Sequence, residues 1–107
     1  MSGTKAELLS NAILEEAFGD DLEARAIPWT MIIELIMDMI GGCGAARAAQ
    51  RAVQPTWRDR VLLGRELRRD GFRWRDRRKI TDAAFKVAAE AGVDEVTEAM
   101  KEIEDID

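Results

Sequence analysis

The side chains best suited to chemistry in this sequence are arginines, gathered in one stretch of the chain. Ten Lys or Arg residues lie between positions 58 and 79, interleaved with the aromatic residues Trp57, Phe72 and Trp74. A guanidinium group presents a planar fork that fits phosphate and carboxylate equally well, and an exposed aromatic ring can stack on a nucleic-acid base. The side chains that we expect to make such contacts are Arg58, Arg65, Arg68, Arg69, Arg73, Arg75, Arg77, Arg78 and Lys79.

Charge is sorted into three blocks along the chain. Residues 47–79 carry twelve Lys or Arg and four Asp or Glu, a net charge of +8. Residues 1–46 carry a net charge of −6 and residues 80–107 one of −7, so the whole chain has a charge of −5. A basic block within an acidic protein either pairs with acidic flanks, in the same chain or a neighbouring copy, or holds an outside polyanion. The sequence leaves both alternatives open.

Residue types that usually carry catalysis or bind metal are scarce. The chain has no histidine, which is the commonest general base at neutral pH and the commonest metal ligand. Cys43 lies in a Gly-Gly-Cys-Gly context with no imidazole to activate it, and Glu34 and Asp38 form an i, i+4 pair that does not complete a calcium cage. We therefore expect no enzyme, no metal site and no cofactor.

The elements that must position the arginines are predicted to be helices. Apolar residues recur at steps of three and four, and Gly19 and Gly92 follow such stretches as helix ends do. Alanine-rich stretches favour close approach of helices. The chain length predicts one domain over residues 1–107, of all-α class, with five or six helices and a core shared with neighbouring subunits. The predicted helices cover 5–18, 29–40, 45–53, 57–69, a stretch from Asp76 or Thr81 to Ala91, and 94–105.

The predicted helix over 29–40 is apolar around most of its circumference. Only Thr30, Glu34 and Asp38 form a polar stripe on it, so it needs neighbours on several sides. It is shorter than the roughly 20 residues of a membrane span, and its acidic stripe does not suit a membrane surface. Both a core position and a contact between subunits remain open. The predicted contact residues are Trp29, Ile32, Ile33, Ile36, Met39 and Ile40.

Aromatic residues are expected to anchor the basic segment on the core. Phe72-Arg73-Trp74-Arg75 alternates with period two, which favours an extended connector with the aromatic rings on one side and the arginines on the other. On this interpretation Trp57, Phe72 and Trp74 are buried and the arginines meet carboxylates. The inner side of the helix over 57–69 is predicted to carry Trp57, Val61, Leu62 and Leu67. If the segment binds nucleic acid instead, Trp74 should be exposed.

These patterns favour a non-enzymatic structural or adaptor subunit that packs into a larger homo- or hetero-assembly, such as a virion or another multi-copy particle. The alternative is a nucleic-acid-binding protein that uses the Arg-rich segment 58–79, and a third possibility is an acidic inhibitor that mimics a polyanion. A single cysteine and the absence of a signal-peptide pattern at the start favour the cytoplasm, or a particle assembled there.

Overall fold

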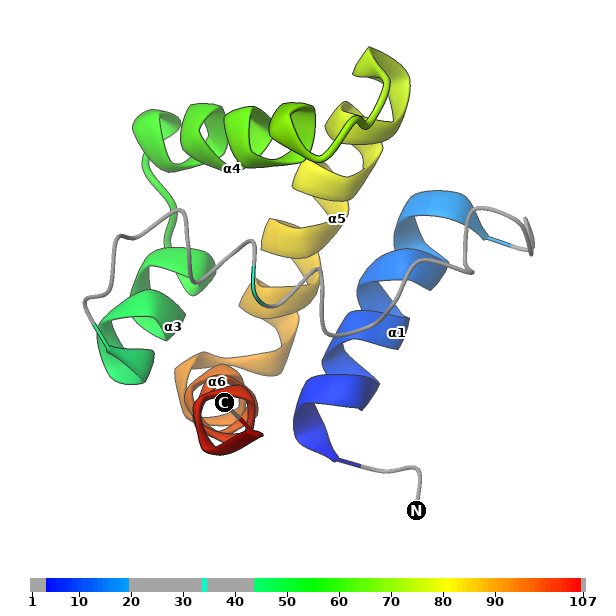
Figure 1. Cartoon of the computed structure of the whole chain (residues 1–107). Helices are drawn as coiled ribbons and strands as arrows, with labels where there is room; N and C mark the ends of the chain where they lie inside the picture. The colour runs from blue at the N-terminus through cyan, green and yellow to red at the C-terminus, as the bar shows by residue number, and fades with distance from the viewer. Residues whose placement is uncertain (1–3, 20–33, 35–43, 107) are drawn as a thin grey trace.

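The computed structural model describes residues 4–19, 34 and 44–106, and these contain five helices, of which the last four follow one another through short turns (Figure 1). No strand occurs within this part of the chain, which confirms the all-α prediction. The segment 29–40 lies outside the described residues except for Glu34, which is exposed, so its role as a subunit contact stays a prediction. The helices are α1 (Lys5–Phe18), α3 (Ala45–Val53), α4 (Trp57–Arg69), α5 (Trp74–Ala91) and α6 (Val93–Ile106).

Helix α5 is the centre of the arrangement. It runs obliquely through the middle of the molecule in Figure 1 and packs against each of the four other described helices. The helices meet largely through alanine, which lets their axes approach closely because little side chain separates them. The buried alanines are Ala6 of α1, Ala45, Ala48, Ala49 and Ala52 of α3, Ala83, Ala84 and Ala88 of α5, and Ala99 of α6. Larger side chains such as Leu67, Ile80 and Met100 fill the remaining space.

Four of the five helices lie where the sequence predicts them, to within a residue at either end, but α5 begins earlier than expected. The chain leaves α4 through a Schellman motif, in which the Phe72 N–H donates to the Leu67 carbonyl at 3.2 Å and the Gly71 N–H to the Arg68 carbonyl at 3.0 Å. Gly71 adopts a φ of 91°, which only glycine reaches without strain. The reversal is complete by Arg73, so Trp74 and Arg75 are helical rather than part of an extended connector.

Acidic side chains of α6 connect this helix to the start of α1. The Lys5 and Ala6 N–H groups donate to the two carboxylate oxygens of Glu102, at 3.1 and 3.3 Å. The Lys5 ammonium group pairs with Glu95 at 3.2 Å and also with Glu98. The free N–H groups of a helix N-terminus favour negative charge, so carboxylates of α6 stabilise the first turn of α1.

The start of α4 is held by a buried carboxylate. Asp59 accepts a hydrogen bond from the Thr56 N–H at 2.9 Å, and the Thr56 hydroxyl oxygen accepts one from the Asp59 N–H at 3.3 Å, which together form a capping box. The same carboxylate pairs with Arg51 of α3, and its side chain is 1% exposed. Burial raises the pKa of Asp59, but the hydrogen bonds from Arg51 and Thr56 outweigh burial, so its pKa lies below the ordinary value of 3.8.

We predict that Asp59→Asn lowers the free energy of unfolding by about 2–3 kcal/mol at neutral pH, because the Arg51 charge loses its partner. A lowered pKa in the folded state stabilises the protein above the unfolded pKa, and this stabilisation is lost as pH falls through the folded pKa. The difference between the two proteins, measured by urea unfolding, should therefore shrink below about pH 4. Asp76→Asn, in the first turn of α5, is the control and should change stability by less than about 1 kcal/mol. A difference in the free energy of unfolding between the two proteins that stays constant down to pH 2 would contradict the lowered pKa of Asp59.

Candidate nucleic-acid interface

The rotation of α4 about its axis is set by a stripe of inner residues. Asp59, Leu63 and Leu67 follow one another at steps of four and are all buried. Trp57 lies about 200° away from Asp59 around the helix, so it points outward and is 80% exposed. Val61 is also exposed. The prediction that Trp57 and Val61 lie on the inner side is therefore wrong, and the physical reason is that the capping carboxylate, rather than the indole, turns inward.

The second tryptophan also faces solvent. Trp74 is 63% exposed at the start of α5, so the prediction that it anchors the turn by burial is wrong. Phe72, two positions earlier, is partly buried and packs against the hydrophobic core, as predicted. One aromatic side chain is enough to provide the hydrophobic contact that accompanies the Schellman motif. Trp74 comes after that contact and is free to project from the first helical turn.

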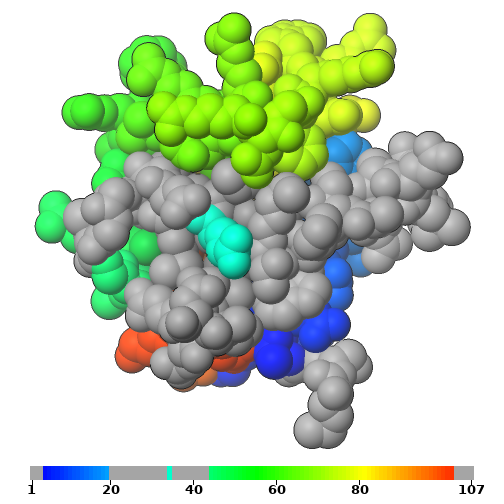
Figure 2. Space-filling model, viewed as in Figure 1, coloured from blue at the N-terminus to red at the C-terminus, as the bar shows by residue number. Residues whose placement is uncertain are grey.

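The two tryptophans line one open groove between α4 and α5, with a volume of about 540 Å³. Gly64 of α4 also lines this groove and presents no side chain. A second hollow, of about 480 Å³, adjoins Trp74 and is lined by Arg73, Arg75 and Asp76. The Trp–Arg groove is defined here by Trp57, Val61 and Gly64 of α4 and by Trp74, Arg77, Arg78, Thr81 and Asp82 of α5. Long side chains of α4 and of the start of α5 project from this end of the molecule in Figure 2.

Most of the cationic side chains around this groove have no acidic partner among the described residues. Arg60 pairs with Asp82 at 3.7 Å, and Arg69 pairs with Glu66 at 3.2 Å. Within the described ranges, no carboxylate lies within ion-pair distance of the other eight bases of the segment 58–79. Arg73 and Arg75, which were expected to meet carboxylates, are exposed instead. The unpaired bases are Arg58, Arg65, Arg68, Arg73, Arg75, Arg77, Arg78 and Lys79.

Aromatic rings and cations lie next to one another at this end of the molecule. The Arg78 guanidinium carbon lies 5.9 Å from the centre of the Trp74 ring, which is within cation–π distance. The two side chains therefore contact each other at the surface. The Arg60 guanidinium carbon also lies 5.1 Å from the centre of the Phe85 ring. The groove therefore offers flat apolar surface and positive charge together, a combination that suits an anion carrying flat rings.

Several of the described acids of the two acidic blocks lie away from this surface and are engaged elsewhere. In Figure 1, α4 and the start of α5 lie at the top, whereas α6 and the start of α1 lie at the bottom. Glu95, Glu98 and Glu102 are used there on Lys5 and on the end of α1. Glu16 of α1 pairs with Lys86 of α5 at 2.6 Å. Of the described acids after Lys79, only Asp82 pairs with the basic segment.

Other classes of site find little support in the described residues. They contain no group of three or more His, Cys, Asp or Glu that could hold a metal ion. None of the described helices is long and apolar enough to cross a membrane. Comparisons of the chain with protein-family models, curated proteins and solved structures found no match. Function is therefore argued from the groove itself.

We predict that Trp74→Ala and Trp57→Ala each lower the free energy of unfolding by less than about 1 kcal/mol, because both rings are largely exposed. Leu67→Ala, which removes a fully buried side chain of the same helix as Trp57, should cost about 2–5 kcal/mol. Thermal and urea unfolding of the three variants measure this contrast. A loss of 3 kcal/mol or more at Trp74 would show that the ring is an anchor after all.

Proposed function

We propose that this chain is a non-enzymatic binding protein whose Trp–Arg groove holds single-stranded nucleic acid. The observation that carries the proposal is the exposure of two tryptophans in one groove, among arginines that have no acidic partner within the described part of the chain. Exposure of Trp74 is the outcome that the nucleic-acid interpretation of the sequence requires. The only buried carboxylate among the described residues, Asp59, is engaged by Thr56 and Arg51, so it is not available for acid–base chemistry.

The chemistry of the groove matches that of a single strand. Stacking of a base on an aromatic side chain contributes about 1–3 kcal/mol and tolerates any sequence, because every base has a flat face. Arg77 and Arg78 lie beside Trp74, where a stacked nucleotide would present its phosphate. Arg65 and Arg68 extend the positive surface along the exposed face of α4. Base stacking and phosphate contact can thus occur together.

A duplex fits this surface less well than a single strand. A recognition helix must present side chains along its length to the edges of bases in the major groove. Beyond Lys79, α5 buries Ile80, Ala83 and Ala84 against the core and offers few long side chains to reach base edges. An indole also needs an unstacked base as partner, and single strands supply one without a cost in base pairing.

The overall negative charge does not prevent this binding. The molecule measures 35 × 30 × 26 Å along its principal axes, and charges are screened beyond about 10 Å at 0.1 M salt. A single-stranded nucleic acid at the Trp–Arg groove is therefore attracted mainly by the basic side chains near the groove. Residues 57–79 carry ten bases and four acids, and one of these acids, Asp59, is buried in its pair with Arg51.

A structural or adaptor subunit of a larger protein assembly is the second candidate. The observation that favours it is that α4 and the start of α5, which carry the basic segment 58–79, lie at the opposite end of the molecule from α6 with its Glu95, Glu98 and Glu102. This arrangement would orient neighbouring copies. The predicted contact helix over 29–40 belongs to this candidate and lies outside the described residues. Both candidates make the Trp–Arg groove a surface for a partner.

The test is a titration of the protein with labelled single-stranded DNA and RNA of about 12 nucleotides, followed by fluorescence anisotropy and by quenching of tryptophan fluorescence. Trp57→Ala and Trp74→Ala should each weaken binding by roughly tenfold, because one stacked base is lost. Arg65→Gln together with Arg68→Gln should lower the slope of log affinity against log salt by about 0.7 for each phosphate contact.

Lys101→Gln is the matched control, since it removes one positive charge from the acidic end of the molecule. It should leave affinity within about twofold, because Lys101 lies on α6 and away from the groove. A sulfated polysaccharide of similar charge density should bind more weakly than the single strand, since it has no bases to stack. Absence of binding at about 0.05 M salt, or equal affinity of the tryptophan variants and wild type, would refute the proposal.

A further inference from the structure

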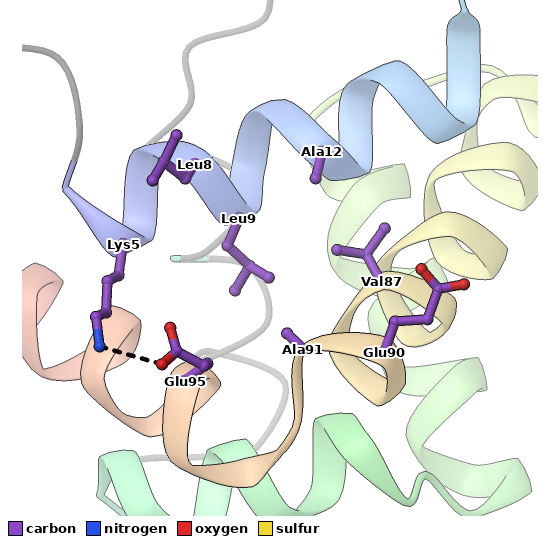
Figure 3. Close-up of a pocket in the computed structure, with 8 residues that line it drawn as sticks. All are labelled: Lys5, Leu8, Leu9, Ala12, Val87, Glu90, Ala91 and Glu95. Atoms are coloured by element: carbon purple, nitrogen blue, oxygen red, sulfur yellow. Dashed lines mark hydrogen bonds and ion pairs between the residues drawn. The ribbon is translucent and has the colours of Figure 1, made fainter.

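A second groove lies at the opposite end of α5. It has a volume of about 360 Å³ and is lined by residues of α1, of the last turns of α5 and of the start of α6. Figure 3 shows Leu9 and Ala12 of α1 facing Val87 and Ala91 of α5 across the hollow. Most of the lining is apolar. We call it the α1–α5 groove, and define it by Lys5, Leu8, Leu9, Ala12, Val87, Glu90, Ala91 and Glu95.

This groove exposes more apolar surface than the fold requires. Leu8 is 60% exposed at its margin, although the neighbouring Leu9 is buried. A large exposed apolar side chain beside an apolar hollow is typical of a surface that a partner covers. The occupant must therefore supply an apolar group that fits between α1 and α5.

The charges at the margin indicate that the occupant is basic. Glu90 and Glu95 both line the groove and are exposed. Lys5 is the only base in the lining, and it is already paired with Glu95 and Glu98, whose hydrogen bonds raise the pKa of Lys5. No described base lies within ion-pair distance of Glu90. The margin is thus negative on balance.

We propose that the α1–α5 groove receives Trp57 of a second copy of this chain, with arginines of that copy placed against Glu90 and Glu95. Trp57 is the most exposed large apolar residue among the described ones, and Arg58 beside it has no described acidic partner. Trp74 is the weaker choice because its ring is already covered in part by Arg78. The surface around Trp57 is apolar and surrounded by basic side chains, whereas the α1–α5 groove is apolar with an acidic margin. The two surfaces are therefore complementary.

The placement of the two surfaces fixes the kind of assembly. Trp57 lies at the start of α4, whereas Val87, Glu90 and Ala91 lie in the last turns of α5. A contact between two different surfaces is heterologous, so copies add head to tail into a ring or an open chain. A symmetric contact between two α1–α5 grooves would instead bring glutamates of both copies together, which is unfavourable. This inference does not depend on nucleic-acid binding.

The experiment is sedimentation velocity of the full chain from micromolar to millimolar concentration at low salt, with one variant for each surface. Trp57→Ala removes the inserted side chain, and Ala12→Arg fills the α1–α5 groove and adds a repelling charge. Each variant alone should be monomeric where wild type forms a concentration-dependent series of oligomers. An equimolar mixture should form a heterodimer and nothing larger, since each variant retains one half of the contact.

Further variants keep the test decisive. Glu90→Lys, at an exposed position, replaces Ala12→Arg if the latter fails to fold, and should weaken self-association at least tenfold. Trp74→Ala should assemble as wild type does. A monomeric wild type, self-association of Trp57→Ala alone, or no complex in the mixture would overturn the proposal. Ala12→Arg leaves the Trp–Arg groove intact. The affinity of this variant for single-stranded nucleic acid therefore distinguishes a failure of the self-association proposal from a failure of the nucleic-acid proposal.

Discussion

The buried carboxylate of Asp59 is the interaction on which the rest of the functional surface depends. It caps α4 through Thr56 and joins α4 to α3 through Arg51, so it fixes both where α4 starts and which face turns inward. Leu63 and Leu67 then follow on the inner side by helical periodicity. Trp57 is exposed as a direct consequence. An acidic residue in the first turn, and not an aromatic one, thus determines what the basic segment presents to solvent.

Alanine packing around α5 explains how a chain of this length can leave large apolar side chains exposed at both ends of the folded molecule. Small side chains bring α1, α3 and α6 close to α5, and much of the core is filled by backbone and methyl groups rather than by aromatic rings. The tryptophans of α4 and α5 are therefore not needed for the core. Large apolar side chains that a fold does not bury usually mark surfaces that contact a partner.

Local signals predict four of the five described helices closely, but they miss the start of α5 and the directions of several side chains. Gly19, Thr56 and Gly92 mark helix ends through backbone chemistry that can be read from the sequence. The apolar residues of the helix over 57–69 predict that Trp57 lies on the inner face, whereas burial of Asp59 depends on Arg51, eight positions away in another helix. The i, i+4 spacing of Asp59, Leu63 and Leu67 was the available signal for the true face. Likewise, the alternation at 72–75 did not reveal that a Schellman motif completes the turn by Arg73.

The sequence also misleads about charge when it is averaged over the chain. The net charge of −5 suggests that acids neutralise the basic segment, yet the described acids act mostly on helix ends and lysines of their own region. Glu102 serves the backbone of α1, and Glu98 serves Lys5. A carboxylate that is fixed on a helix N-terminus cannot also reach an arginine at the far end of α5. Within the described residues, geometry thus leaves a locally positive surface in an acidic protein, and for the proposed binding at the Trp–Arg groove this local field matters more than the total charge.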